Sequence, residues 1–536
     1  MAAIIHELTL LQEREGWLSE DSLRALAERL GVPLHRVESV STFYTHFRRT
    51  PPPKTEIAVC RDLSCMMGGG ESKLAALRER FKGQEDVEIT EVSCLGRCDG
   101  APAACVGHEV VNLNDDSAVD RAIESGGHAA GPAAPEKWAA DIYESPAERY
   151  GALRAALERD RADIVQTLKD SGLRGMGGAG FPTGLKWDLV AREEATPKYV
   201  ICNADESEPG TFKDRQILSD LPHLVIEGLA LAAYVIDGGR GACRQGWVFI
   251  RHEYEPERQA LEAAIEEARK VGALGENIFG SNFSFDIEIF VSPGGYILGE
   301  ETALIECMED KRGEPRNKPP FPGQQGLWNQ PTLMNNVETF AHTVGIVHKG
   351  LEWWNGLGEE GHAGHKFISV SGDVEKPGVY LVPMGIPIRG LLERAGGMKD
   401  GRPLVAVAPG GASSNFLPPD QLDVPMDFQT LADAGSMLGS GAAVFVAEGH
   451  DLLEVGVNVA RFFRNESCGK CVPCRVGSEK AVALLEEKKK VDGDTAALLE
   501  ELNETLYQTS ICGLGQVALG PLLSIVRNFG DQIPRE

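Results

Sequence analysis

The stretch ESCGKCVPCRVG, residues 466–477, holds three cysteines, each separated from the next by two residues. A fourth cysteine follows in SICGLGQ, residues 510–516. Three closely spaced thiolates can hold one side of an iron–sulfur cube, which a distant fourth completes. Zinc usually takes two separated C-x2-C pairs, so the triple run favours a [4Fe–4S] cluster, with a zinc site as the alternative. The predicted ligands are Cys468, Cys471, Cys474 and Cys512.

A second cysteine set lies near the start of the chain, in AVCRDLSCMMGGG (58–70) and EVSCLGRCDGAP (91–102). Four thiolates in two short loops suit a [2Fe–2S] cluster, with zinc or two disulfides as the alternatives. The first residues, MAAIIHELTLLQEREG, lack the basic stretch and apolar run of a secretion signal. This predicts a cytoplasmic protein whose clustered cysteines serve metal or redox chemistry. The predicted ligands are Cys60, Cys65, Cys94 and Cys98.

Length and charge limit the possible functions. A chain of 536 residues predicts about three to five domains, and 42% hydrophobic residues suffice for packed cores. The net charge of −27 argues against nucleic acid and anionic membrane surfaces as partners. The best apolar candidate for a membrane span, Leu224 to Ile236, is too short and contains Glu227. We therefore predict no direct membrane contact.

The chain divides into segments of different pattern. Helical spacing in LSEDSLRALAERLGV (18–32) predicts a helical N-terminal segment, 1–53, that the prolines at 51–53 end sharply. Strand and helix patterns then predict a small α/β domain at 54–125, with both cysteine pairs in loops that follow strands. A Gly/Ala/Pro-rich linker follows at 126–148. The remaining predicted units are an α/β ligand-binding domain at 149–361, a β-grasp-like domain at 362–442 and a helical bundle at 443–536.

A glycine-rich stretch, SGLRGMGGAGFPTGLKW (171–187), opens the chemistry of the ligand-binding domain. Its glycines would let backbone N–H groups approach a phosphate or a flat ring, and Lys186 adds a positive charge. The preceding residues have the pattern of a helix, whereas a Rossmann fingerprint follows a strand. From this stretch alone, an ordinary surface loop is an equal alternative.

Three more stretches carry polar residues in suggestive places. KYVICNADESEPGTFKDR (198–215) predicts a strand that ends in polar side chains, where α/β sheets bind ligands. In IEIFVSPGGYILGEETALIECM (287–308) a second strand leads to a helix that begins at a pair of glutamates. PTLMNNVET (331–339) contains two adjacent asparagines. Polar turns, helix caps and carboxylates placed to satisfy a helix dipole are the alternatives.

All these motifs occur together and in order. From about residue 149 to its end, the chain resembles the NADH-binding flavoprotein subunit of respiratory complex I and its soluble relatives. Residues 1 to about 125 resemble the thioredoxin-like [2Fe–2S] subunit of the same systems, here fused in front. The implied fold is a multidomain α/β protein. Its units would be a helical N-terminus, a thioredoxin-like ferredoxin domain, a Rossmann-like FMN/NADH domain, a β-grasp (ubiquitin-like/SLBB) domain and a C-terminal helical bundle with the [4Fe–4S] cluster.

The resemblance also implies cofactors and their residues. The cofactors are FMN, NAD(H), one [4Fe–4S] and one [2Fe–2S] cluster. Glu208 and Glu301 are the candidate catalytic residues, which would orient the nucleotide or shape the local charge. FMN would lie against Gly175, Gly177, Lys186, Asn203, Asp205, Ser207, Gly299, Glu300, Asn335 and Asn336. NAD(H) would be lined by Phe181, Lys186, Glu208, Glu301, Lys318 and Phe321.

The implied function is that of an NADH-oxidoreductase (diaphorase) module. A hydride carries two electrons and a cluster accepts one, so FMN would exchange hydride with NAD(H) and single electrons with the clusters. Met176 stands where complex I usually has arginine. This resembles the beta subunit of NAD-dependent formate dehydrogenase, whose catalytic alpha subunit holds further Fe–S clusters and a molybdenum or tungsten cofactor. The alternatives are a NAD-reducing hydrogenase or complex I, and a cluster-binding electron carrier or scaffold without NAD(H) turnover.

Overall fold

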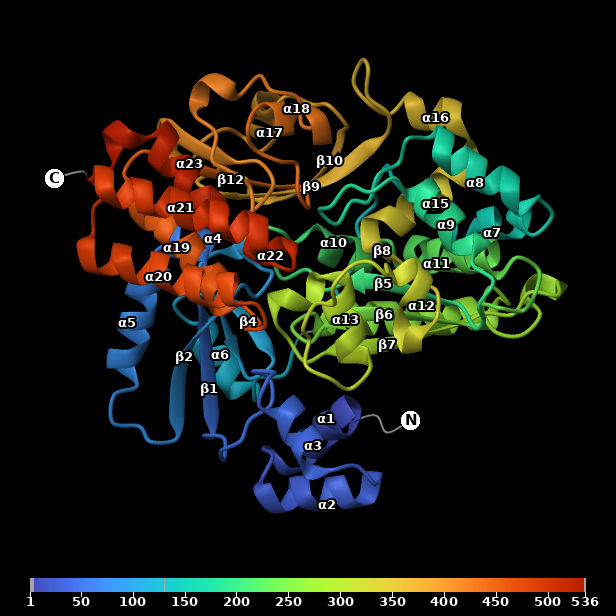
Figure 1. Ribbon diagram of the computed structural model, residues 1–536, viewed down its shortest axis with the longest axis horizontal. Coiled ribbons are helices and arrows are strands. Elements are labelled where there is room, and N and C mark those ends of the chain that lie inside the picture. Colours follow the sequence, from blue (N-terminus) through green and yellow to red (C-terminus); the bar gives the residue numbers. More distant parts are fainter. Residues whose placement is uncertain (1–3, 130, 535–536) are drawn as a thin grey trace.

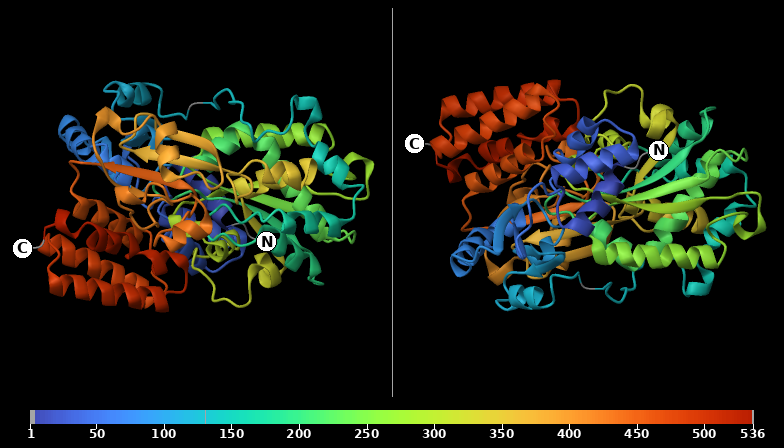
Figure 2. Two further views of the ribbon diagram at one scale, coloured as in Figure 1. Left: turned by 90° about the horizontal axis from the view of Figure 1, so that it is seen from above. Right: turned by 90° about the horizontal axis from the view of Figure 1, so that it is seen from below.

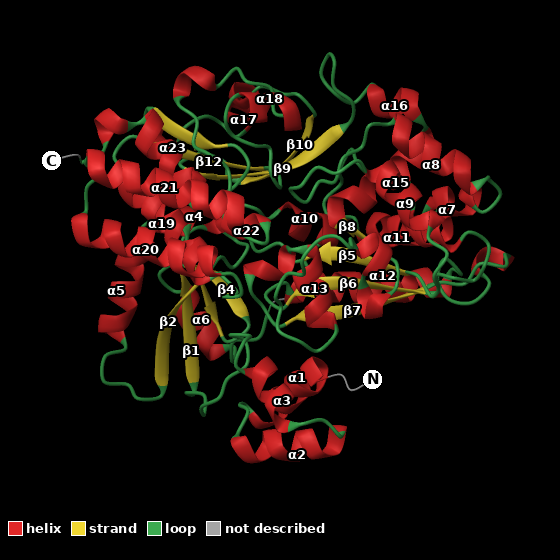
Figure 3. Ribbon diagram, viewed as in Figure 1, coloured by secondary structure: helices red, strands yellow, loops and turns green. Residues whose placement is uncertain are grey.

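The computed structural model describes residues 4–129 and 131–534. Figure 1 shows the N-terminal helices and a small α/β domain below, and a larger α/β domain to one side. A third, sheet-containing domain lies above, and a helical bundle occupies the other side. Helices and loops surround three separate sheets (Figure 3).

Three short helices form the N-terminal unit, as predicted. The Ser19 hydroxyl caps the second helix by accepting from the Ser22 N–H at 3.0 Å, and Gly31 ends it with a φ of 67°. The last helix ends at Ser41, and an irregular segment precedes the prolines at 51–53. The prediction that the prolines themselves end the helical unit is therefore wrong. The helices are α1 (Ile4–Glu15), α2 (Glu20–Leu30) and α3 (Leu34–Ser41).

The small α/β domain has a four-stranded sheet in the order β2-β1-β3-β4. β1 runs parallel to β2 and antiparallel to β3, and a turn at Gly107 joins β3 to β4. The five-residue helix α4 was not predicted, so Cys65 lies in a helix rather than in the predicted loop. The strands are β1 (Thr55–Cys60), β2 (Val87–Val92), β3 (Ala103–Val106) and β4 (Glu109–Asn112). The helices are α4 (Leu63–Met67), α5 (Gly70–Arg80) and α6 (Ala118–Glu124).

The larger α/β domain contains an all-parallel sheet in the order β7-β6-β5-β8. Both faces are buried: Val200 packs in one hydrophobic core with α11, and Ile201 packs in the other with α13. The strands are β5 (Tyr199–Ala204), β6 (Gln245–Arg251), β7 (Asp286–Ser292) and β8 (Thr332–Asn336). The helices are α7 (Gly151–Ala156), α8 (Arg161–Asp170), α9 (Thr183–Arg192), α10 (Lys213–Asp220), α11 (Pro222–Asp237), α12 (Glu255–Lys270), α13 (Glu301–Met308), α14 (Pro322–Gln325), α15 (Val337–Lys349) and α16 (Leu351–Asn355).

The third sheet has the order β10-β9-β12-β11. Its central strands are parallel and its outer strands are antiparallel to their neighbours. β12 spans Ala442–Ala447, so the predicted boundary after residue 442 is wrong because it cuts a central strand. The other elements are β9 (His365–Gly372), β10 (Gly378–Pro383), β11 (Leu404–Ala408), α17 (Ile388–Arg394) and α18 (Phe428–Asp433).

The C-terminal helices form a bundle at one end of the molecule (Figure 2). Asp451 begins the bundle by capping α19, where its carboxylate accepts from the N–H groups of Leu453 and Glu454. The helices are α19 (Leu452–Asn465), α20 (Val472–Lys488), α21 (Gly493–Thr509), α22 (Gly513–Val517) and α23 (Gly520–Asn528).

Contacts cross the boundaries between these units. One hydrophobic core joins the larger α/β domain to the third sheet, and the other joins it to the N-terminal helices and the bundle. The linker is also docked, because the Trp138 indole donates to Asp220 at 2.6 Å and its ring contacts Phe367. Among the described residues no single helix is long and apolar enough to cross a membrane. Among the same residues, one helix pair, α10–α11, is long and apolar enough when taken together, but it is bent by 93°. Helix α11 is almost wholly buried.

Candidate functional site

The glycine-rich stretch forms a loop between α8 and α9, next to the carboxyl end of β8. The Gly175 N–H donates to the Phe181 carbonyl at 2.9 Å and closes the loop. Gly178 has a φ of 130° with open space where a side chain would be, and a Cβ at Gly177 would lie 2.9 Å from Asn336. The loop thus offers bare backbone beside the strand ends, as a phosphate or a flat ring requires.

Predicted polar residues gather at the same edge of the sheet. The Asn203 carboxamide donates to the Gly299 carbonyl at 2.8 Å, which joins the end of β5 to the approach to α13. Asp205 accepts from the hydroxyl of Ser207 and, at 3.0 Å, from that of Ser292. Burial raises the pKa of Asp205 to about 6. Perturbed carboxyl groups at a strand end are typical of a ligand site.

The two adjacent asparagines make contacts within the protein. Asn335 is buried, and its carboxamide oxygen accepts from the Trp187 indole at 3.0 Å. Asn336 caps α15 by accepting from the Glu338 N–H at 3.0 Å. The helix-cap alternative is confirmed for Asn336, while contact of either residue with a flavin stays a prediction.

Lys186 lies partly buried between the glycine loop and β8. Its Nζ donates to the Met334 carbonyl at 3.1 Å. Burial lowers the pKa of Lys186, and Glu301 opposes that shift. In the part of the chain that the structure describes, no carboxylate lies within 4.0 Å of this ammonium. A partly buried cation of this kind fits an anionic group such as a phosphate.

A second charged cluster lies at the start of α13. Lys318 Nζ is 2.8 Å from a carboxylate oxygen of Glu300 and 2.8 Å from one of Glu301. Glu300 also caps the helix, accepting from the N–H groups of Thr302 and Ala303 at 2.9 Å. The predicted alternative of a dipole-satisfying carboxylate is therefore present together with the ion pairs.

Two exposed aromatic rings belong to the same region. Phe181 is 42% exposed, and its ring centroid lies 5.9 Å from Lys186 Nζ. Phe321 is 55% exposed and immediately precedes α14. Exposed aromatic rings beside cations are suited to stacking on a nucleotide base.

Glu208 has a different environment from the other predicted residues. Its carboxylate accepts from the Ser413 N–H at 2.8 Å and the Ser440 hydroxyl at 3.4 Å, both in the domain of the third sheet. Burial raises its pKa. Among the described residues, no hydrogen bond or ion pair joins Glu208 to Glu301 or Lys318. The two candidate catalytic carboxylates thus lie in separate contact networks.

The four N-terminal cysteine thiols are buried and lie together. Cys94 Sγ is 3.5 Å from Cys98 Sγ. The Gly96 N–H donates to Cys94 Sγ, and the Gly210 N–H of the larger α/β domain donates to Cys98 Sγ, each at 3.4 Å. Hydrogen bonds to sulfur are among the features that tune Fe–S centres, so this donor set fits a [2Fe–2S] cluster.

Three of the C-terminal cysteines lie around the start of α20, and Cys512 lies just before α22. Cys474 is buried and the other three are partly exposed. Cys471 is the N-cap of α20, and the Ser467 hydroxyl lies 3.2 Å from Cys474 Sγ. Burial raises the pKa of Cys512 to about 12, so iron binding there would release a proton. Four thiols are the donor chemistry that a [4Fe–4S] cluster requires.

The loop that carries Cys94 docks on the larger α/β domain. The buried Arg251 guanidinium donates to the Cys94 carbonyl at 2.6 Å and also contacts the Glu206 carbonyl, next to Asp205. One side chain therefore joins the predicted cluster loop to the predicted flavin loop.

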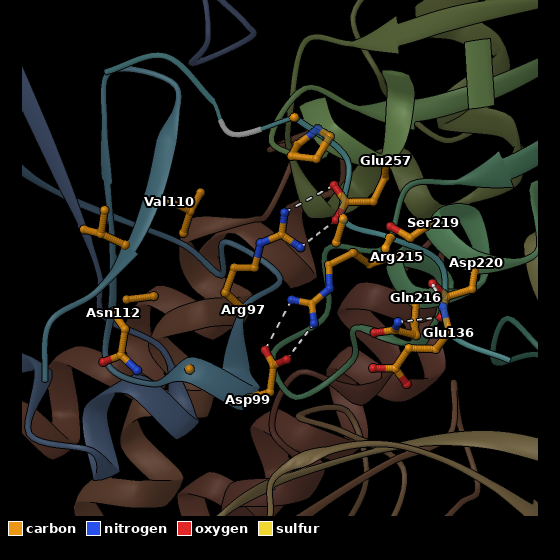
Figure 4. A pocket seen from close by; sticks show the side chains of 17 residues that line it. Arg97, Asp99, Val110, Asn112, Glu136, Arg215, Gln216, Ser219, Asp220 and Glu257 are labelled. Atoms are coloured by element: carbon orange, nitrogen blue, oxygen red, sulfur yellow. Dashed lines mark hydrogen bonds and ion pairs between the residues drawn. The ribbon is translucent and has the colours of Figure 1, made fainter. Parts of the chain in front are cut away.

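Figure 4 shows two arginine–carboxylate pairs at the edge of this contact. Arg97 donates to both oxygens of Glu257 at 2.8 and 3.2 Å, and Arg215 donates to both oxygens of Asp99 at 3.2 and 2.6 Å. They line a cavity of about 470 Å³ between the small domain, the linker and α10. The sequence analysis missed these arginines because ion pairs between distant segments leave no local pattern.

Glu466 joins all three candidate cofactor regions. Its carboxylate accepts from the Tyr296 N–H at 2.8 Å, shortly before α13, and from the hydroxyl of Ser93, next to Cys94. Glu466 itself precedes Cys468 by two positions. In the sequence, Glu466 is marked only by its position at the start of the cysteine motif ESCGKCVPCRVG.

Comparison with known proteins divides the chain in the same way. Residues 1–126 match the thioredoxin-like [2Fe-2S] ferredoxin family, and residues 168–344 match the Nuo51 FMN-binding domain. Residues 367–415 match the SLBB domain, and residues 454–536 match the NADH-ubiquinone oxidoreductase-F iron-sulfur binding region. The F 2 subunit of the NADH-quinone oxidoreductase of Rhizobium meliloti (strain 1021) is 45% identical over 384 residues, covering 71% of this chain and 90% of that protein. The chain belongs to the NADH-quinone oxidoreductase F-subunit family.

Two further similarities extend beyond quinone reductases. The HndC subunit of the NADP-reducing hydrogenase of Solidesulfovibrio fructosivorans is 43% identical, covering 72% of this chain and 78% of that protein. The crystal structure of NAD+-reducing [NiFe]-hydrogenase in the H2-reduced state matches with a TM-score of 0.86 at 30% identity. That match covers 98% of this chain and 92% of the hydrogenase chain, so it includes the N-terminal unit.

The four domain matches confirm the predicted multidomain fold and the cofactors. The chain is an NADH-dependent flavin and iron–sulfur oxidoreductase module with FMN, a [2Fe–2S] cluster and a [4Fe–4S] cluster. The predicted β-grasp-like unit is the SLBB domain.

Proposed function

We propose that the carboxyl edge of the parallel sheet binds FMN and NAD(H), and that the two cysteine sets hold the clusters. When bound there, FMN would supply the exchange between a two-electron hydride and the single electrons that clusters accept. The observation that carries this proposal is Lys186, a partly buried ammonium beside the glycine loop with a carbonyl rather than a carboxylate partner. Its positive charge matches a phosphate or the polar edge of a flavin.

The chain's own residues bind and orient in this proposal. Lys318, held by two glutamates, would contact the phosphates of the dinucleotide, and Phe181 or Phe321 would stack on its adenine. Glu301 would shape the local charge, and Glu208 would close the site from the SLBB side. The residues proposed to contact FMN are Gly175, Gly177, Lys186, Asn203, Asp205, Ser207, Gly299, Glu300, Asn335 and Asn336.

Electrons would leave toward the bundle. The Tyr296 ring packs on Phe462 of α19 with centroids 4.9 Å apart, so the start of α13 and the [4Fe–4S] region are neighbours. Val472 and Val476, on one face of α20 beside the cysteines, are 59% and 51% exposed. Apolar surface around partly exposed ligands supports this face as the contact with an electron-accepting partner.

We propose further that the parent complex is a cytoplasmic NAD-dependent formate dehydrogenase, with this chain as the beta subunit. Its alpha subunit would carry further Fe–S clusters and a molybdenum or tungsten cofactor. The support for this assignment is the resemblance at Met176, where complex I usually has arginine. The Met176 sulfur lies 3.8 Å from Lys366 Nζ, so an arginine there would bring a second cation toward that ammonium. A NAD-reducing hydrogenase is the second candidate, because the similar hydrogenase structure covers 98% of this chain. Complex I, as in the Rhizobium relative, is the third.

Anaerobic purification of the native complex, followed by elemental analysis, tests the parent complex. Stoichiometric molybdenum or tungsten would support formate dehydrogenase. Nickel would support a hydrogenase, and neither metal together with membrane subunits would support complex I. NADH-dependent dye reduction by the same sample tests the cofactor site. Bound FMN without such reduction would contradict the NAD(H) site and favour the electron-carrier alternative.

A further inference from the structure

A group of buried charges lies directly beneath the glycine loop. Lys366 Nζ is 2.9 Å and Lys213 Nζ is 3.0 Å from the same carboxylate oxygen of Glu338. Lys213 also pairs with Asp214 at 2.6 Å. The four side chains are at most 5% exposed, so two ammonium and two carboxylate groups pair with one another away from water.

The four residues come from different parts of the fold. Lys213 and Asp214 begin α10, and Glu338 lies in the first turn of α15, whereas Lys366 belongs to β9 of the SLBB domain. Burial lowers the pKa of Lys366, and Glu338 opposes that shift. Burial acts to raise the pKa of Glu338, but the two lysines hold it well below its usual range. The pairing of buried charges in the larger α/β domain therefore depends on Lys366, a residue from the SLBB domain.

The network meets the glycine loop at Met176, between Gly175 and Gly177. The Met176 N–H donates to the Thr339 hydroxyl at 2.9 Å, and Lys366 Nζ reaches the Met176 carbonyl at 3.5 Å. The N–H and the carbonyl of Met176 are thus both held by side chains of the residues packed against the loop, Thr339 and Lys366. Conformational freedom of the two flanking glycines makes such support necessary for a fixed loop shape.

Asn336 connects the same network to the strand end. Its carboxamide donates to Asp214 at 2.5 Å, and Lys213 Nζ lies 3.4 Å from its oxygen. The Asn336 side chain is also the group that a Cβ at Gly177 would strike. The charge network therefore supports both the glycine loop and the residue packed against it.

We propose that Lys366 is a positioning residue for the FMN site, supplied by the SLBB domain. It holds the Met176 backbone and balances Glu338 beneath a loop that has to accept an anionic phosphate. Without Lys366, one lysine would face two carboxylates, and the excess negative charge would repel the phosphate across a medium of low polarity. This inference rests on the proposed FMN site.

The test compares Lys366→Met with Lys198→Met. Lys198 is also fully buried, but its Nζ donates to the carbonyls of Val190 and Ala191 at 2.8 and 2.9 Å, away from the glycine loop. FMN-depleted full-length protein is titrated with FMN, and quenching of flavin fluorescence gives the dissociation constant. We expect Lys366→Met to raise this constant roughly tenfold or more, as loss of one partner from a buried charge network implies. Lys198→Met should leave it unchanged even if it lowers the melting temperature.

A double variant separates charge balance from the contact with Met176. Lys366→Met with Glu338→Gln removes one charge of each sign, and the glutamine can still accept from the Phe367 N–H that Glu338 binds at 2.8 Å. It should bind FMN more tightly than Lys366→Met but more weakly than the wild type. Wild-type affinity in a folded Lys366→Met protein with both clusters would overturn the proposal. If Lys366→Met does not fold, wild-type affinity in the double variant would do so.

Failure of the FMN site itself would look different. A Lys186→Ala variant would then also keep wild-type FMN affinity. If only the role of Lys366 is wrong, Lys186→Ala loses affinity while Lys366→Met does not.

Discussion

Lys186 differs from the ion-paired lysines of the chain because its partner is a backbone carbonyl rather than a carboxylate. Its ammonium donates to a carbonyl beside the glycine loop. We expect Lys186→Ala to weaken FMN binding about tenfold or more, the size of losing one charge-assisted contact, and thereby to slow NADH oxidation. Flavin content and steady-state NADH oxidation measure the effect. Lys169→Ala, which removes a pair with Asp188, is the control and should change neither quantity.

The cysteine ligands allow a test of the two cluster sites separately. We expect Cys471→Ser to lower the iron content and abolish the [4Fe–4S] signal in electron paramagnetic resonance, because a hydroxyl is a poorer iron ligand than a thiolate. The [2Fe–2S] signal should remain, since its proposed ligands belong to another domain. Loss of both signals in a chain that still binds FMN would contradict separate sites.

Among the elements, several with clear periodicity were predicted, whereas β8 and α4 were not. The alternation in HKFISVSG predicted β9, and the apolar run YVIC predicted β5. β8 was missed because its five residues end in two asparagines, which resemble a cap more than a strand. α4 was missed because its five residues precede three glycines. Backbone pairing with neighbouring strands, absent from any local pattern, decides a strand such as β8.

The parts of the site that lie in local motifs could be predicted, and the parts that depend on contacts between distant segments could not. Cysteine spacing and motif order indicated the ligand sets and the loops around the proposed FMN site. The contacts of Glu208 with the SLBB domain, and the roles of Arg251 and Lys366, depend on segments brought together only by folding. Side chains that join domains carry no periodic signal, so sequence alone does not reveal them.

Helix α11 provides a test at the scale of an element. Its buried Glu227 accepts from the Tyr143 hydroxyl at 2.9 Å and the Leu153 N–H at 2.8 Å, which tie the linker and α7 to the helix. Burial raises the pKa of Glu227 from 4.5 to about 7. Between these values the folded protein keeps a proton that the unfolded chain releases. This group's contribution to stability is therefore complete below about pH 4.5 and falls by about 3 kcal/mol as the pH rises through 7.

We expect Glu227→Gln to remove that part of the pH dependence. Melting temperatures of wild type and variant, measured from pH 4.5 to 8, should show a smaller decline for the variant. Equal declines would mean that Glu227 does not titrate in this range.

On the scale of the whole molecule, Glu466 allows a test of how the small domain, the larger α/β domain and the bundle hold together. Glu466→Ala removes the acceptor shared by Ser93 and Tyr296. Amide hydrogen exchange should then rise about fivefold to tenfold in both segments, as loss of one or two buried hydrogen bonds implies. FMN and iron contents should be unchanged. Glu479→Ala, in the exposed part of α20, is the control. Unchanged exchange in Glu466→Ala would show that Glu466 does not hold these units together.

The contact between Glu466 and Ser93 also bears on how the protein folds during translation. Ser93 leaves the ribosome 373 residues before Glu466, which at about 5–20 residues per second is an interval of roughly 20 to 75 seconds. Gly210 and Arg251, which cover the loop of Cys94 and Cys98, are also translated after it. During translation these thiols therefore remain open to iron and sulfide donors, and they become enclosed only when the later parts of the chain arrive.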